Sequence, residues 1–221
     1  SRTADNIWGF YDRELTKNTR DWKQILDIGP TSREGPTMGS VPQWPKALTG
    51  FQNIVEKFNA ECERVAQLIT AGISVNRGMP ADYLASAFGD AHTSFLRLNY
   101  YPVCDDPAPE NAATIPDKGQ LGVNRHTDAG AVTGLLQDDQ AGLQVLRGER
   151  WYTIHPRPDA LVMKLHMRQH ASCIMGCSRH QIPISCQSRG SAIVIKDAVF
   201  AQHQTVSCLT HLQRFEPVAV Q

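Results

Sequence analysis

One short segment of the 221-residue chain combines two side chains that could bind a metal ion. Residues 122–130 read Gly-Val-Asn-Arg-His-Thr-Asp-Ala-Gly. If this segment is a β-strand, residues two apart share a face, so His126 and Asp128 point one way and Thr127 points the other way. An imidazole beside a carboxylate offers two adjacent ligands to a divalent metal, and two His with one carboxylate are the ligand set of non-haem Fe(II) centres. The pair would equally fit an ordinary polar strand end.

The first part of the chain is predicted to contain helices and loops. Apolar residues recur at intervals of three and four over residues 44–73, which predicts a helix with one buried stripe. A second, shorter helix is expected over residues 80–88, with Pro in its first turn and Gly at its end. The first forty residues have few apolar positions and lead into the Pro/Gly-rich stretch 29–45, so we expect a turn or two and then an ordered loop. Residues 1–91 are therefore predicted to form an N-terminal helical and loop region.

After residue 91 the apolar period changes from helical to two, which is typical of half-buried strands. Polar turns separate these segments at short and regular spacing, as in an all-β sandwich or barrel. We therefore expect a mainly β fold, with strands over residues 95–101, 123–127, 131–137, 142–146, 151–155 and 160–165.

Composition excludes several classes of partner. Lys and Arg number 22, equal to Asp and Glu, so the chain has no net charge to attract a nucleic acid or an anionic membrane surface. No apolar run approaches the roughly 20 residues that span a bilayer. The chain starts without Met and without the apolar core of a signal peptide, which predicts a processed or incomplete chain in the cytoplasm. The six Cys lack disulfide-framework spacing and are expected to be reduced thiols.

Five segments together resemble the isopenicillin N synthase-like iron/2-oxoglutarate-dependent dioxygenases. The resemblance is collinear from about Phe95 to Met163, and residues 9–23 resemble the end of that family's N-terminal region. The five segments are Arg-Leu-Asn-Tyr-Tyr-Pro at 97–102, His-Thr-Asp-Ala-Gly at 126–130, Leu-Leu-Gln-Asp-Asp at 135–139, Gly-Leu-Gln-Val at 142–145, and Trp-Tyr at 151–152 followed by Pro-Asp-Ala-Leu-Val at 158–162.

The resemblance implies a double-stranded β-helix (jelly-roll) core over residues 92–221 that oxidises a small organic molecule by hydroxylation or desaturation. Its cofactor would be Fe(II), with 2-oxoglutarate and O2 as co-substrates. His126 and Asp128 match the family's first two metal ligands, and Asn99 and Tyr101 match the polar pair that touches 2-oxoglutarate. Asn99 and Tyr101 are expected to project into the same cavity from a strand beside the one that carries His126. They would also fit a half-buried strand with hydrogen bonds of its own. Neither the substrate nor the oligomeric state is predicted.

The resemblance ends after Met163. Where a typical member continues with Asn, a small apolar residue, Gly and Asp, residues 164–170 read Lys-Leu-His-Met-Arg-Gln-His. The expected His-Arg-Val of the third metal ligand is replaced by Ser-Cys-Gln at 185–187, and His180 is left unassigned. Arg189 and Ser191 match the family's Arg-x-Ser clamp for 2-oxoglutarate by their letters, but they come too early in the chain.

Three other hypotheses remain open. His166, His170, Cys173, Cys177 and His180 are spaced like one stripe of a helix, which would fit either a zinc site or a core seam. The whole chain could also be a catalytically impaired remnant or a non-catalytic β scaffold, with slow or absent turnover of 2-oxoglutarate. A hydrolase is disfavoured because the sequence has no Gly-x-Ser-x-Gly segment.

Overall fold

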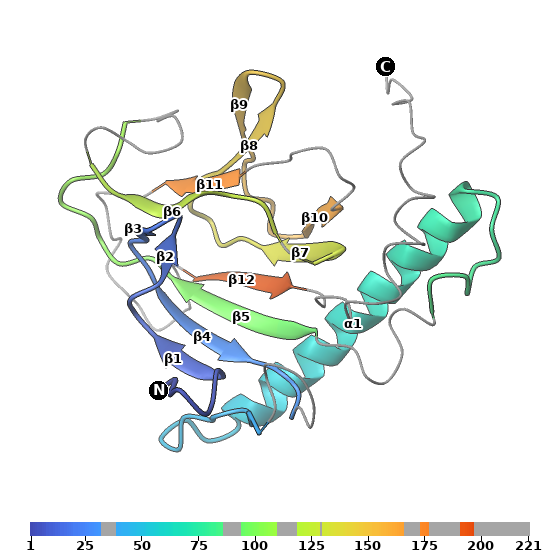
Figure 1. Cartoon of the computed structure of the whole chain (residues 1–221), viewed down its shortest axis with the longest axis horizontal. Coiled ribbons are helices and arrows are strands. Elements are labelled where there is room, and N and C mark those ends of the chain that lie inside the picture. The colour runs from blue at the N-terminus through green and yellow to red at the C-terminus, as the bar shows by residue number, and fades with distance from the viewer. Residues whose placement is uncertain are drawn as a thin grey trace.

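The computed structural model describes residues 1–31, 39–85, 94–109, 119–128, 130–165, 173–176 and 191–196. This part of the chain forms two facing antiparallel β-sheets, the arrangement of a jelly roll, and one long helix packs on the outer face of the larger sheet (Figure 1). The expectation of a mainly β jelly-roll core is confirmed.

The larger sheet has six strands, and strands far apart in sequence lie side by side in it. β5 lies between β4 and β12, and β7 lies between β12 and β10. The sheet order is β1 (Gly9–Tyr11), β4 (Gln24–Ile28), β5 (Phe95–Tyr100), β12 (Ser191–Lys196), β7 (Val132–Leu136) and β10 (Val162–Leu165).

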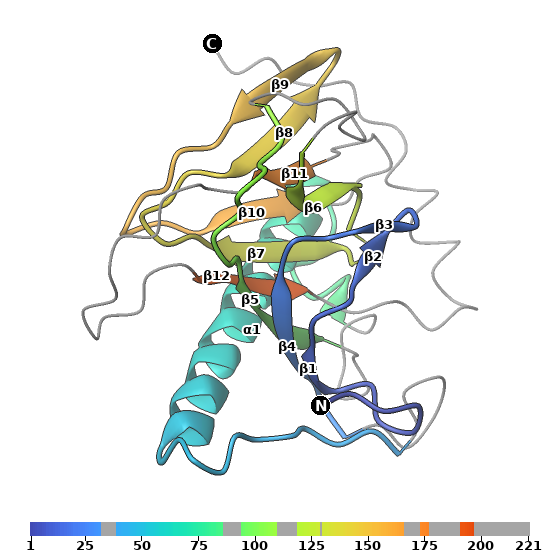
Figure 2. The same ribbon diagram turned by 90° about the vertical axis from the view of Figure 1, so that its left-hand side faces the viewer.

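The smaller sheet has four strands and lies across the larger one (Figure 2). A separate two-stranded hairpin, β2 (Leu15–Thr16) and β3 (Thr19–Arg20), lies beside its β6 strand in both views. The order of the smaller sheet is β6 (Leu121–His126), β11 (Cys173–Gly176), β8 (Leu143–Arg147) and β9 (Arg150–Thr153).

Strand β5 separates an apolar layer from a polar one. Leu96 and Leu98 pack toward α1 (Phe51–Asn76), in a cluster in which Leu96 is fully buried. Because side chains alternate along a strand, Arg97 and Asn99 point to the opposite face, between the two sheets, and both are buried there. Strand β5 thus presents an apolar face to α1 and a polar face to the interior between the two sheets.

Helix α1 confirms the expected helix, but its ends differ from the expected ones. Gly50 precedes the helix with φ 81, a left-handed conformation that cannot continue a helix, and residues 46–50 form turns and a bend instead of the expected start of the helix. At the other end the helix passes through the exposed Gly72 and stops before Gly78, which has φ 72. The buried stripe is Val55, Cys62, Ala66, Thr70 and Ser74.

One expectation for the first part of the chain is wrong, and a second, the helix over residues 80–88, is not confirmed. The first forty residues contain four strands rather than turns and a loop, and β1 and β4 extend the larger sheet. β4 lacks the expected strand pattern because its inner face carries the charged Asp27 instead of an apolar side chain. Residues 81–84 form turns, and residues 86–93 lie outside the described part, so α1 is the one α-helix of the described chain. The division at residue 91 stays a prediction, although the larger sheet takes strands from both sides of it.

The expected strands from residue 95 to residue 165 are confirmed as β5 to β10, within about two residues at most ends. Between the sheets, Val123, Leu135 and Leu143 form an apolar cluster joined by Tyr101 and Val162. Cys62 and Cys104 are free thiols. Within the described part of the chain, no helix has the length and apolarity needed to cross a bilayer.

Candidate metal centre

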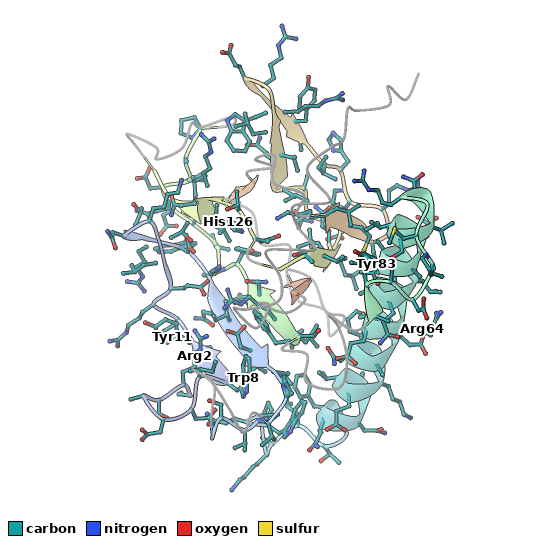
Figure 3. The ribbon with its side chains drawn as sticks, turned by 45° about the vertical axis from the view of Figure 1, so that its right-hand side comes forward. Arg2, Trp8, Tyr11, Arg64, Tyr83 and His126 are labelled. Atoms are coloured by element: carbon teal, nitrogen blue, oxygen red, sulfur yellow. The ribbon has the colours of Figure 1, made fainter. Side chains whose placement is uncertain are left out.

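The structure brings His126 and Asp128 together at the end of β6. His126 is the last residue of this strand, well away from the Arg64 side of α1 (Figure 3). Its Nε2 lies 3.3 Å from Oδ1 of Asp128, whose side chain is 3% exposed. Asp128 lies beyond the strand, so the pair converges through the chain that follows β6 and not through the expected alternation along one strand.

The ring of His126 is oriented by a backbone carbonyl. Nδ1 lies 2.9 Å from the carbonyl oxygen of Asn124, and because a carbonyl only accepts, Nδ1 carries the proton and donates it. In the neutral ring Nε2 then has a lone pair directed toward Asp128. Two acceptor atoms 3.3 Å apart are compatible when they share a cation, and either a proton on Nε2 or a divalent metal meets this requirement.

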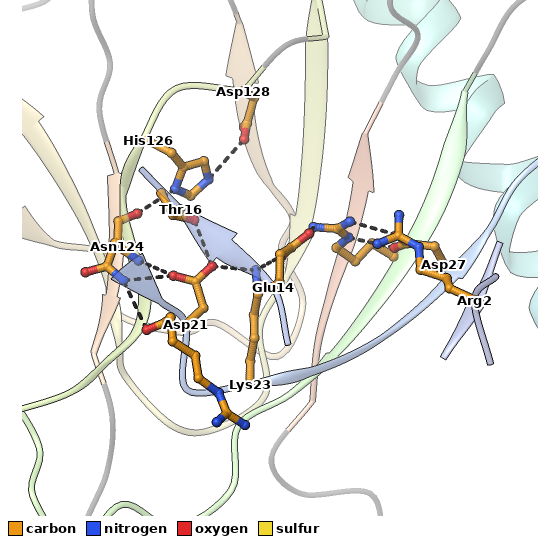
Figure 4. A network of polar contacts seen from close by, with 11 residues as sticks. Arg2, Glu14, Thr16, Asp21, Lys23, Asp27, Asn124, His126 and Asp128 are labelled. Carbon is orange, nitrogen blue, oxygen red and sulfur yellow. Dashed lines mark hydrogen bonds and ion pairs between the residues drawn. The ribbon is translucent and has the colours of Figure 1, made fainter. Parts of the chain in front are cut away.

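Asn124 is held in turn by Asp21, 103 residues earlier in the chain. Both the backbone N–H and the side-chain amide of Asn124 donate to Oδ1 of Asp21, each at 2.9 Å (Figure 4). The hydroxyl of Thr16 donates to Oδ2 at 2.7 Å. Asp21 is 1% exposed, so this carboxylate fixes the strand segment that orients His126 from a position without solvent.

The β2–β3 hairpin places Asp21 beside β6. Lys17 and Asn18 form its two-residue turn with φ 51 and φ 63, the positive values that a tight hairpin turn of type I′ requires. Directly after the hairpin, the N–H of Trp22 donates to the carbonyl of Leu121 at 2.9 Å. The N-terminal segment is therefore hydrogen-bonded to the strand that ends in His126.

The polar contacts continue from Asp21 toward β5. Lys23 lies 3.5 Å from Oδ2 of Asp21 and 2.5 Å from Oε2 of Glu14. Glu14 also accepts from Nη1 of Arg97 at 2.9 Å. Arg97 donates to both oxygens of Asp27, at 2.6 and 2.7 Å. We call this chain of contacts the interior polar network (Figure 4). Its members, in order of contact, are Asp27, Arg97, Glu14, Lys23, Asp21, Asn124, His126 and Asp128.

Arg97 stays charged in this network. Burial alone would lower its pKa, but its hydrogen bonds and ion pairs with Asp27 and Glu14 outweigh burial and hold the pKa above its usual range. Arg2 adds a further ion pair to Asp27, at 2.9 Å. At this end of the network, two guanidinium groups therefore balance the carboxylates of Asp27 and Glu14.

At its other end the network meets a lysine from the opposite sheet. Lys164 of β10 forms an ion pair with Oδ2 of Asp128, and its side chain is 14% exposed. β10 is an edge strand of the larger sheet, whereas Asp128 follows a strand of the smaller sheet. The buried carboxylate is therefore contacted by His126 on one oxygen and by an ammonium group on the other.

Asn99 and Tyr101 lie on the other side of the interior from His126. β5 belongs to the larger sheet and β6 to the smaller, so the expectation that they lie on a strand beside that of His126 is wrong. Tyr101 nevertheless packs against the cluster that includes Val123 of β6, and Asn99 is 2% exposed on the same strand face as Arg97. Their contact with 2-oxoglutarate stays a prediction.

The remaining candidate residues fall largely outside the described part. The structure does not describe five of them: His166, His170, Cys177, His180 and Arg189. The backbone of Cys173 is paired with His126, and that of Ser191 with Tyr100. Among the described side chains, no group of three His, Cys, Asp or Glu residues forms a metal site.

Sequence reasoning missed Asp21 and Lys164 as neighbours of the candidate ligands. Asn18 is a usable signal for the β2–β3 hairpin, since Asn tolerates the positive φ that such a two-residue turn requires, but the contact of Asp21 with β6 depends on tertiary packing. Lys164 stands out in the sequence only as a departure from the family pattern. Its contact with Asp128 depends on the packing of two sheets, which no local pattern encodes.

Comparison with known proteins identifies a family that matches this core. The model described as "2OG-Fe(II) oxygenase superfamily" matches residues 92–192. The matched range includes β5 to β11, with both His126 and Asp128.

Curated plant proteins are similar over about two thirds of the chain. Protein DOWNY MILDEW RESISTANCE 6 of Arabidopsis thaliana is 35% identical over 154 residues, which are 69% of this chain and 40% of that protein. Flavanone 3-dioxygenase 2 of Oryza sativa subsp. japonica is 34% identical over 69% of this chain and 40% of its own length. The chain thus spans about 40% of the length of these relatives.

Solved structures of low sequence identity share the fold. A crystal structure of JOX2 in complex with 2OG, Fe and JA superposes with a TM-score of 0.66 at 22% identity, covering 86% of this chain and 54% of that chain. A full-length Neurospora crassa protein in complex with alpha-KG and thymine gives a TM-score of 0.64 at 20% identity, covering 89% of this chain and 64% of that chain.

Proposed function

Since the chain belongs to the 2OG-Fe(II) oxygenase superfamily, we propose that it oxidises a small organic molecule by hydroxylation or desaturation. Enzymes of this family use Fe(II) and 2-oxoglutarate with O2 as co-substrate, and by resemblance this chain is one of them, a dioxygenase. Flavanone, in the name of one relative, and thymine, bound to one solved structure, are small organic molecules. They support a small-molecule substrate without identifying it.

The observation that supports the proposal most is the convergence of His126 and Asp128. Nδ1 of His126 is engaged by the Asn124 carbonyl, so Nε2 is the nitrogen left to face Asp128 and to bind a metal. A neutral imidazole and a carboxylate are two of the three protein ligands that suit Fe(II). When bound, the iron would supply the oxygen chemistry that no side chain performs.

Asn99 and Tyr101 are proposed to position 2-oxoglutarate. Asn99 is buried on the interior face of β5, where its amide NH2 group can donate to an oxygen of a dicarboxylate. Tyr101 packs against the apolar cluster between the sheets, which would keep water from the cosubstrate. Both face the interior that lies between β5 and β6.

A second candidate function, a catalytically impaired oxygenase or β scaffold, is favoured by two observations. The ammonium group of Lys164 pairs with the same carboxylate that would bind iron. The sequence also lacks the His-Arg-Val segment expected to supply the third ligand. With two ligands and a competing cation, 2-oxoglutarate turnover is expected to be slow.

Anaerobic titration separates the two candidates. Fe(II) and 2-oxoglutarate are added to the purified chain without oxygen, and the visible charge-transfer band of the chelated pair is recorded. A band that is lost in the His126→Ala variant supports the metal centre, and succinate release in air with a panel of phenolic and amino-acid-derived substrates then measures turnover. A band of equal intensity in the variant would refute the assignment of His126.

A further inference from the structure

Lys164 reaches the candidate metal centre from the sheet opposite to β6. Its backbone is paired with Thr133 of β7, and Val162, two residues earlier on the same strand face, packs into the apolar cluster between the sheets. The side chain of Lys164 therefore projects into the interior, where its ammonium group contacts Oδ2 of Asp128. The ion pair is almost enclosed, with side chains 14% and 3% exposed.

A buried carboxylate needs a counter-ion, and Asp128 has one before any metal is bound. A divalent ion held by His126 and Asp128 would lie within a few ångströms of the Lys164 ammonium. Two cations at one carboxylate repel each other strongly where solvent screening is weak. The metal and the ammonium group are therefore alternative partners of the same buried charge.

We propose that Lys164 is an internal counter-ion that competes with the divalent metal for Asp128, so that the metal binds only when the ammonium group withdraws. This inference rests on the proposed function, because it takes His126 and Asp128 as metal ligands. Lysine suits such an exchange: its charge is a compact point on a flexible stem, without the fixed fork of arginine. The partial exposure of Lys164 leaves the ammonium group a route toward water.

Lys23 provides a matched comparison within the same interior. It is also a buried lysine, 4% exposed, but its ion pairs are with Glu14 and Asp21, neither of which is a candidate metal ligand. If the loss of any buried lysine raised metal affinity, both lysines would behave alike. If the effect is specific to Asp128, only Lys164 will show it.

The test is calorimetric titration of Mn²⁺, an oxygen-stable stand-in for Fe(II), into the whole chain and five variants, one of which is His126→Ala alone. Lys164→Met keeps the length of the side chain and removes the charge, and it is expected to bind Mn²⁺ about ten- to a hundredfold more tightly than the unaltered chain. Lys164→Arg retains the charge and should not gain affinity. Lys23→Met should show no gain, and His126→Ala in the Lys164→Met background should abolish it.

The outcomes separate this inference from the proposed function. If the unaltered chain and Lys164→Met bind Mn²⁺ equally well, and His126→Ala weakens both, the metal centre stands and the competition is refuted. If neither binds Mn²⁺ and His126→Ala changes nothing, the metal centre itself is wrong. Unfolding temperatures give a second readout, since Lys164→Met should be less stable than the unaltered chain without metal and should gain more stability from Mn²⁺.

A measurement on the unaltered chain decides the matter if Lys164→Met does not fold. Acetic anhydride at limiting concentration acetylates exposed amines, and peptide mass spectrometry reports each lysine separately. Saturating Mn²⁺ should raise the acetylation of Lys164 several-fold, because the displaced ammonium group moves to solvent, and should leave Lys23 unchanged. Unchanged labelling of Lys164 under saturating Mn²⁺ would overturn the proposal.

Discussion

The interior polar network has a buried aspartate at each end, and the two are satisfied in different ways. Asp27 is fully buried, and each of its oxygens accepts from Arg97, at 2.6 and 2.7 Å, while Arg2 adds a further ion pair. Asp128 is similarly buried, but one oxygen faces the imidazole of His126 and the other faces the ammonium group of Lys164.

The difference between these ends lies in the geometry of the cation. The planar fork of Arg97 matches the carboxylate of Asp27 at two points and fixes its orientation. An ammonium group contacts Asp128 as a point charge, and a metal ion can replace a point charge without rearranging the carboxylate. We call the Asp27 end, with its forked cation, the structural end of the network, and the Asp128 end, with its single ammonium group, the proposed metal-binding end.

The largest expected effect comes from breaking the structural end. Arg97→Met leaves Glu14 and Asp27 short of a buried cation, which costs about 3 to 5 kcal/mol of unfolding free energy. Urea denaturation followed by circular dichroism measures this loss. Because the pKa of Arg97 lies above its usual range, its contribution is fully present at neutral pH and is lost only in strong alkali, so the deficit should be the same at pH 6 and pH 8.

The loss of stability in Arg97→Met is expected to come from the buried carboxylate that is left without its cation, and a double variant tests this. Replacement of a buried ion pair as a whole by apolar side chains is often neutral, so Arg97→Met combined with Asp27→Leu should recover part of the stability. A single variant as stable as the unaltered chain would contradict the structural role assigned to Arg97.

An intermediate effect is expected where the two ends meet, at Asp21. Asp21→Ala removes the acceptor of both Asn124 donors and so releases the strand segment that orients His126. Loss of such an indirect support of a metal ligand lowers metal affinity by about ten- to a hundredfold, and we expect the lower part of that range for Mn²⁺. Calorimetric titration of Mn²⁺ measures the change.

Thr16→Val is the matched control for Asp21. It removes the hydroxyl that donates to Oδ2 of Asp21 and leaves Oδ1, with its contacts to Asn124, in place. Stability should fall by about 1 kcal/mol, the usual net contribution of one hydrogen bond, with metal affinity nearly unchanged. Equal losses of affinity in both variants would show that the fold, and not the orientation of His126, is responsible.

The smallest effect is expected from an ion pair outside the network. Arg64 lies on α1 (Figure 3). It forms an ion pair with Glu61, one turn away, and the two side chains are 60% and 68% exposed. Arg64→Ala should change the unfolding free energy by less than about 0.5 kcal/mol, because water screens the pair and the side chains lose conformational freedom when they form it. A loss comparable to that of Arg97→Met, measured in the same urea series, would remove the distinction between buried and exposed pairs.

The β core was predictable because its strands obey simple alternation. Residues 95 to 165 alternate apolar and polar side chains at short spacing, and the structure has β5 to β10 there. Strand β4 was not predictable on the same rule, because Asp27 occupies its interior face and is balanced by Arg97 from another strand. Helix α1 was predictable from its stripe, whereas its start depends on the left-handed conformation of Gly50.

The candidate site divides in the same way. That His126 and Asp128 lie together was predicted from their spacing of two, but the reason differs, because Asp128 lies beyond the end of β6 and shares no strand face with His126. Asp21 and Lys164 were not predictable, because each reaches the site from another structural element. Charged residues that become neighbours only through tertiary packing leave no periodic signal in the sequence.

The contact between Asp21 and Asn124 also bears on how the chain folds. It joins residues 103 positions apart, and bringing such distant segments together carries a loop-closure entropy that local contacts do not. Chains rich in such contacts fold slowly. We expect the local β2–β3 hairpin to form early and to dock only after β6 has paired within its sheet. In refolding experiments the ability to bind metal should therefore return after most of the secondary structure, as a late kinetic phase.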